Sequence, residues 1–388
     1  MILIIIYILS LLVIWRLHKN ISFFADMLYV VYIVSAIFGL LLVFYRSETN
    51  YVSQTESYIP LLFLLLIVVL WNEPYVKLST ISLDRPDRDS SYNFDGISTI
   101  VCAYFFPLSI LLFYNSFKIL TTVDVSVFRI EADYYSYFFG GIFFSLGVYS
   151  SMLCFIPQFL FFLSYRYHVS RVKRFVLLFS SFSFTFMTLC FAGRDGIVYW
   201  LLNSIVFYYY LRDSFNLTEK RRVRNVFYLF AAIILVVFIF ITFSRFIIGG
   251  HFDNGDSVVL PLIDYLGQPI HIFCQSLSLS PEQLRNLDST NYLVTTFGTF
   301  VKALYMRHGY YLTIIISLLQ FLIVRGIVQV YNRTHNLWDL MILYLVYQIP
   351  LYGVFYYRQG IQSMEIVYLV ALGLFLILKL FNIKPLKI

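Results

Sequence analysis

The chain has 388 residues, of which 60% are hydrophobic, 20% are aromatic and only 13% are charged, with a formal net charge of +7. A soluble globular domain carries roughly 25% charged residues, so this composition argues against one. No solvated domain gathers the positive charge, which argues against a nucleic-acid-binding protein. The bias of basic residues toward the cytoplasmic loops of membrane proteins explains the charge instead. The four cysteines are scattered and predict neither a metal site nor a disulfide framework.

Eleven apolar segments follow one another along the chain. Helices that are apolar on every face belong in lipid, and about 20 residues cross its hydrocarbon core. Continuous runs, without alternation, favour helices over barrel strands. We expect spans near residues 1–15, 22–44, 58–71, 97–115, 138–165, 175–192, 196–211, 226–247, 309–328, 337–355 and 364–381. The sequence thus predicts an all-α polytopic membrane protein, with residues 1–388 as one integral membrane domain. Met1 to Trp15 lacks the basic region and cleavage site of a signal peptide, so we expect a retained first span.

The connections between the predicted spans lie alternately on one side of the membrane and on the other. Lysine and arginine divide unevenly between these two sets of connections. One set holds 19 of them and the other holds 9, which together make the 28 of the chain. Because cytoplasmic loops are enriched in lysine and arginine, the richer set is predicted to be cytoplasmic. The N-terminus is then outside and the C-terminus is cytoplasmic.

The longest outer connection, residues 248–308, is also the least lipid-like stretch of the chain. Long loops on membrane scaffolds tend to carry function. His251 and Asp253 lie near its start, and either side chain is a candidate general base. Asp264 and Tyr265 follow a run of apolar residues that predicts a short helix at the membrane interface. A structural plug, and a bystander histidine, are the alternative interpretations.

Four arginines, namely Arg194, Arg245, Arg307 and Arg358, lie at the predicted outer face, against the topology rule. A planar guanidinium suits phosphate, and several of them together would form an electropositive cavity. Arg194 lies in the turn Gly193-Arg194-Asp195-Gly196, where Asp195 can orient the arginine or cap the next helix. A capped hairpin explains the same turn equally well. Snorkelling at the interface would explain Arg245 and Arg358.

The sequence holds none of the common nucleotide, zinc or hydrolase motifs: no P-loop, dinucleotide fingerprint, zinc signature or GxSxG elbow. We therefore expect neither ATP-driven nor hydrolytic chemistry.

Three short motifs resemble those of one family, the bacterial oligosaccharide repeat-unit polymerases of the O-antigen polymerase (Wzy) type. Cys190-Phe191-Ala192-Gly193-Arg194-Asp195-Gly196 resembles their small-Gly/Ser-Arg-x-Gly hairpin. Tyr265 to Pro269 resembles the Tyr-x-x-x-Pro element of their large periplasmic loop. Arg307-His308-Gly309-Tyr310-Tyr311 resembles the start of their next helix, without its usual acidic residue and second glycine. The resemblance covers roughly residues 170–370.

The resemblance implies a GT-C-like membrane glycosyltransferase in the bacterial inner membrane that makes a surface polysaccharide such as lipopolysaccharide. Such an enzyme passes the growing glycan, with inversion, from undecaprenyl pyrophosphate to a new lipid-linked repeat unit. The family is thought to need no metal and no nucleotide sugar, and a chain-length regulator protein is an expected partner. Arg194, Arg245 and Arg358 would then hold the pyrophosphate, with Asp195 and Tyr265 also touching substrate. His251, Asp253 or Asp264 would supply the base.

Three other functions compete with this interpretation. An O-antigen ligase shares the large outer loop and the arginines. A transporter or lipid-oligosaccharide flippase predicts pseudo-repeats and ionisable residues at the midplane, and the sequence shows neither clearly. A structural scaffold would have no chemistry.

Overall fold

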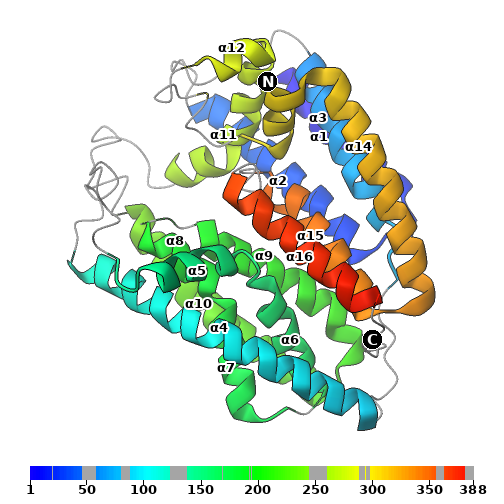
Figure 1. Ribbon diagram of the computed structural model, residues 1–388. Helices are drawn as coiled ribbons and strands as arrows, with labels where there is room; N and C mark the ends of the chain where they lie inside the picture. The colour runs from blue at the N-terminus through cyan, green and yellow to red at the C-terminus, as the bar shows by residue number, and fades with distance from the viewer. Residues whose placement is uncertain are drawn as a thin grey trace. The chain divides into compact units, whose positions relative to one another are not determined.

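A computed structural model describes residues 1–19, 21–45, 58–79, 88–122, 138–167, 169–191, 193, 195–243, 260–287, 293, 298–354 and 362–380. Within these ranges the chain is almost entirely helical, and each of the eleven predicted segments contains at least one helix (Figure 1). The predicted all-helical fold class is therefore confirmed. The chain divides into two compact units, which are described one at a time. The single membrane domain over residues 1–388 stays a prediction.

Unit 1 comprises Met1–Ser79, Ser257–His335 and Asp339–Glu365. Its helices are α1 (Ile2–Leu17), α2 (Phe23–Tyr45), α3 (Ile59–Asn72), the 3-10 turn η1 (Glu73–Tyr75), α11 (Leu260–Ser276), α12 (Pro281–Arg285), α14 (Phe300–Thr334) and α15 (Leu337–Tyr352). Helix α11 packs along α2, and α14 packs on α3 and η1. Tyrosine hydroxyls join these helices by donating to backbone carbonyls: Tyr347 to Phe24 over 2.8 Å and Tyr75 to Leu343 over 2.9 Å. Buried phenols need such acceptors, because no water reaches them.

Unit 2 comprises Thr80–Asp256, Asn336–Trp338 and Ile366–Ile388. Its helices are α4 (Arg88–Thr122), α5 (Ile142–Ser151), α6 (Phe155–Arg166), α7 (Arg171–Ser181), α8 (Ser183–Cys190), α9 (Asp195–Leu211), the 3-10 turn η3 (Arg212–Ser214), α10 (Leu217–Phe243) and most of α16 (Gln362–Leu380). The long helix α4 packs on α5, α7 and α8. In the core, the Gln158 amide donates to the Trp200 carbonyl (2.9 Å), and the Trp200 indole donates to Ser181 Oγ (2.9 Å).

Four helices in the described ranges are long and apolar enough to cross a membrane: Phe23–Phe44, Asn93–Thr122, Arg171–Cys190 and Phe300–Thr334. Helices α5 and α6, bent by 62° at their junction, make a fifth if the pair is one span. Exposed side chains on α14, such as Leu322 at 61% and Ile323 at 62%, suit a lipid-facing surface. These features are consistent with a helical membrane protein. The count of eleven spans and the GT-C-like architecture stay predictions.

Two residues with positive φ shape α14. Gly309 has φ 70° and ψ −176°, so α14 is two helices joined at this residue, where a side chain would be strained. At the other end, His335 adopts the left-handed conformation with φ 47° and stops the helix. The helix that starts after Gly309 therefore begins where the sequence predicted the ninth span to begin.

In unit 1, the polar contacts between separate connections join connections that the sequence predicts on the same side. Three contacts illustrate this: His18 with Glu73, Asn332 with Lys77, and Arg307 with Glu365. The first two pairs join connections predicted to be cytoplasmic, and the third joins connections predicted to be outside. The alternation of spans that the sequence predicts is thus compatible with the packing of this unit.

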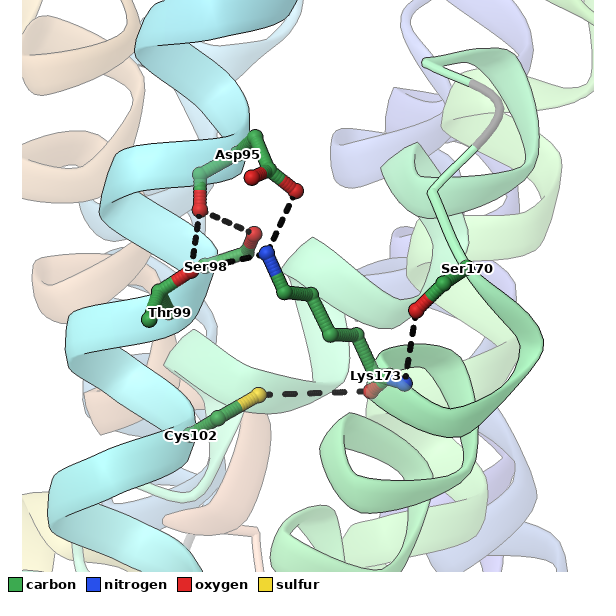
Figure 2. A network of polar contacts seen from close by, with 6 residues as sticks. All are labelled: Asp95, Ser98, Thr99, Cys102, Ser170 and Lys173. Carbon is green, nitrogen blue, oxygen red and sulfur yellow. Dashed lines mark hydrogen bonds and ion pairs between the residues drawn. The ribbon is translucent and has the colours of Figure 1, made fainter.

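Unit 2 holds a similar contact, shown in Figure 2. It joins two connections of the set that contains more lysine and arginine. Lys173 Nζ, near the start of α7, lies 2.6 Å from Asp95 Oδ1 and donates to Thr99 Oγ1 over 2.9 Å. Ser170 caps α7 by accepting from the Lys173 backbone N–H. Because Asp95 and Lys173 are partly exposed, this ion pair contributes about 0–1 kcal/mol to stability. It fixes the start of α7 against α4.

Candidate functional site

The turn between α8 and α9 contains the best-described part of the predicted site. The Gly193 N–H donates to the Thr188 carbonyl over 2.6 Å, which closes the end of α8. Asp195 is the first residue of α9, so its carboxylate lies in the first turn of the helix. A negative charge there is stabilised by the helix dipole. The predicted capping role of Asp195 stays a prediction. Arg194 itself lies outside the described residues.

Gly196 is explained by the packing of α9 on α8. A Cβ at this position would fall 2.8 Å from both the Phe184 carbonyl oxygen and the Thr185 Cα. The Thr185 hydroxyl donates to the Gly196 carbonyl over 3.1 Å and holds the two helices together. The neighbouring helix therefore lies directly against this glycine.

Most of the other predicted site residues lie outside the described residues: Arg245, Arg358, His251 and Asp253, together with the side chain of Asp264. Their predicted convergence on one pyrophosphate therefore stays a prediction. Asp195 belongs to unit 2, whereas Asp264 and Tyr265 belong to unit 1.

Helix α11 forms where the sequence predicted a short helix in the outer loop. Tyr265 is 7% exposed, so its side chain is buried. Gly267 lies against α2, because a Cβ there would fall 2.5 Å from the Phe38 carbonyl carbon and oxygen. Ser35 of α2 donates to the Leu266 carbonyl over 2.9 Å. The segment thus packs closely on a candidate span.

The sequence analysis did not single out His271, which lies on the same helix. It is 2% exposed, and its Nε2 lies 2.8 Å from the Gly39 carbonyl oxygen of α2. Because a carbonyl only accepts, Nε2 carries the proton in this bond. Burial lowers the pKa of His271 below its usual value.

Two cationic side chains, Lys302 and Arg307, lie near the predicted outer end of α14. Lys302 is 8% exposed, and its stem lies against Gly298, where a Cβ would collide with it. The neighbouring Thr299 hydroxyl is buried and has no hydrogen-bond partner within the described ranges. Arg307 forms an ion pair with Glu365, at the start of α16. This pair gives Arg307, one of the four unexplained outer arginines, a structural role.

Among the residues that the structure describes, no group of three or more His, Cys, Asp and Glu side chains could hold a metal ion. Comparisons with protein-family models, with curated proteins and with solved structures find no match for this chain.

Proposed function

We propose that this protein polymerises lipid-linked oligosaccharide repeat units, transferring the growing glycan from undecaprenyl pyrophosphate to a new lipid-linked repeat unit. The observation that carries the proposal is the turn between α8 and α9. In it, Gly193 and Asp195 bracket an arginine at the start of a helix, within the motif that resembles the polymerase hairpin. The setting is an apolar helical protein, as lipid-linked substrates require.

The chemistry explains why arginines would be needed. As the bond between the anomeric carbon and the pyrophosphate oxygen breaks, negative charge develops on the departing lipid pyrophosphate. Fixed donors in a partly dry site stabilise such charge more than water does. The start of α9 adds the backbone N–H groups of the first helical turn and the positive end of the helix dipole. Arg194 and Arg245 would hold the pyrophosphate, and Arg358 would assist.

The acceptor completes the reaction. Its sugar hydroxyl attacks the anomeric carbon from the face opposite the pyrophosphate, which inverts the configuration. The hydroxyl proton passes to a base of the outer loop, namely His251, Asp253 or Asp264. Tyr265 and Asp195 would position the sugars and the arginine. The two lipid tails would reach the site from the side, between helices.

The proposal places the chain in a bacterial inner membrane with the chemistry outside. The N-terminus would be outside and the C-terminus cytoplasmic. The 19 to 9 division of basic residues supports this orientation. The pairing of His18 with Glu73 and of Lys173 with Asp95 supports the alternation of spans on which this orientation rests, because each pair joins connections predicted on the same side.

The test is the glycan chain-length distribution in a deletion strain complemented with variants at matched protein levels. Removing one fixed donor to a developing charge costs about two to three orders of magnitude in rate. Arg194→Ala and Arg245→Ala should therefore each give short glycans. Arg285→Ala is the matched control, because Arg285 is exposed at the end of α12 in the same outer loop. Normal long chains from both site variants would end the proposed pyrophosphate site.

A charge-preserving variant separates charge from geometry. Arg194→Lys keeps the positive charge but loses the two-pronged guanidinium, so it should also be strongly impaired. Long chains from this variant would show that charge suffices. Single variants of His251, Asp253 and Asp264 then identify the base, which is the one whose loss removes activity while the protein still folds.

A further inference from the structure

Unit 1 contains a cavity of about 170 Å³ between η1 and the C-terminal half of α14. Lys77 and Arg325 supply two cations to its lining, Gln329 and Asn332 supply two amides, and Pro74 and Phe321 supply apolar surface. The cavity lies at the end of α14 that the sequence predicts to be cytoplasmic. It is therefore at the face opposite the proposed glycosyl transfer, and it does not depend on that function.

Hydrogen bonds hold the walls of this cavity in place. Asn332 Nδ2 donates to the Lys77 carbonyl over 2.7 Å, and Asn332 Oδ1 accepts from the Ser79 backbone N–H over 3.0 Å. These bonds fasten the segment after η1 to α14. The Arg325 guanidinium lies 5.7 Å from the centre of the Phe321 ring, within cation–π range. The site is thus formed before a ligand arrives.

The charges around the cavity match a single phosphodiester. Lys77 and Arg325 carry two positive charges, and Glu73, which also lines the cavity, carries one negative charge. His18 Nε2 lies 3.2 Å from the Glu73 carboxylate, which turns that acid toward α1. One net positive charge suits a ligand with one negative charge.

A lipid-facing surface adjoins the cations. Leu322, one helical turn before Arg325, is 61% exposed, and Leu318 is 44% exposed one turn earlier. Residues three and four apart share one face of a helix, so this apolar strip leads to the guanidinium. Basic pockets between helices at the cytoplasmic side suit acidic lipid headgroups. We propose that this cavity binds the phosphodiester headgroup of an anionic membrane lipid between Lys77 and Arg325, with an acyl chain along α14.

The test uses native mass spectrometry of the purified full chain in detergent, titrated with phosphatidylglycerol, phosphatidylcholine or inorganic phosphate. Each Lys or Arg that meets an anionic lipid surface is worth about a fivefold change in binding. Lys77→Gln and Arg325→Gln should each weaken phosphatidylglycerol binding by about fivefold, whereas Arg325→Lys should bind nearly as well as the wild type. Arg333→Gln is the matched control, because Arg333 is exposed two turns further along α14 and does not line the cavity.

The wild type provides a second measurement that needs no variant. Raising the salt from about 0.05 M to about 0.5 M should sharply reduce its phosphatidylglycerol binding. Equal binding of phosphatidylglycerol and phosphatidylcholine at low salt would overturn the proposal, as would an unchanged affinity in both Gln variants. If inorganic phosphate competes as strongly as the lipid, the site takes free phosphate and the lipid assignment is wrong.

Discussion

Three buried polar side chains bond to backbone carbonyls of neighbouring elements. Tyr347, Tyr75 and His271 each reach a carbonyl on a different helix or turn from their own. Each such bond contributes about 1 kcal/mol net, and leaving the buried group without a partner costs more. These side chains therefore fix how the helices pair, beyond what an apolar surface specifies.

The histidine on α11 predicts a pH dependence of stability. Because burial holds the pKa of His271 below its unfolded value of about 6.5, the unfolded chain binds the extra proton first as the pH falls. The free energy of unfolding should be greatest above about pH 6.5 and should drop by up to about 1.4 kcal/mol per pH unit below it. Thermal unfolding in detergent across this range measures the drop.

The control for this effect is a second histidine. His271→Gln should flatten the acid limb of the stability curve, whereas His308→Gln, at an exposed position of α14, should leave it in place. An acid limb that survives His271→Gln unchanged would show that other groups cause it.

At the scale of helices, close approaches between backbones decide the packing. Gly196 meets α8, and Gly267 meets α2, at distances that no side chain tolerates. Both glycines lie in segments that resemble polymerase motifs, so these motifs have a structural role whatever their chemistry. Helices can approach in this way only where a small residue faces a neighbouring backbone.

Gly196→Ala tests that structural role. The added methyl would meet α8 backbone atoms, so the variant should unfold with about 1–3 kcal/mol less stability than the wild type, even without substrate. Gly96→Ala is the matched control, because Gly96 lies within α4 with nothing inside 4 Å of the new Cβ. Alanine there should be neutral or stabilising by about 0.5–1 kcal/mol. Equal stability of the two variants would favour a ligand, rather than α8, as the reason for the glycine.

The helix positions were predictable from the sequence, and their partners were not. Apolar runs located α2, α15 and the other segments, because lipid burial acts along a local stretch of chain. The contact of Gly267 with α2 and the pairing of Arg307 with Glu365 depend on residues far apart in sequence, which no periodicity reveals. Pro269 lies inside α11, where a proline removes a backbone hydrogen bond, so the packing of α11 on α2 outweighs this local cost.

The predicted site could be tested only where the described residues reach it. Asp195 lies in the first turn of α9, where the sequence already suggested a helix start from an acid in a turn with two glycines. The buried positions of Lys302 and His271 had no such signal, since burial is a property of the folded chain.

At the scale of the whole chain, unit 1 offers a direct test of orientation. Ser278, after α11, is predicted to be outside, and Thr334, at the end of α14, is predicted to be cytoplasmic; both side chains are exposed. With the four native cysteines replaced, Ser278→Cys should react with a membrane-impermeant thiol reagent on intact cells, whereas Thr334→Cys should react only after permeabilisation. The reverse pattern would invert the orientation and remove the proposed site from the outer face.

The glycan profile of a deletion strain tests the central claim, repeat-unit polymerisation, most directly. Loss of a polymerase leaves single repeat units, because nothing extends them. Loss of a ligase leaves long lipid-linked chains that are not attached to their final carrier, and loss of a flippase leaves the units on the cytoplasmic side. Our account predicts single repeat units on the cell surface, with long chains restored by the wild-type gene. Long chains in the deletion strain would contradict it.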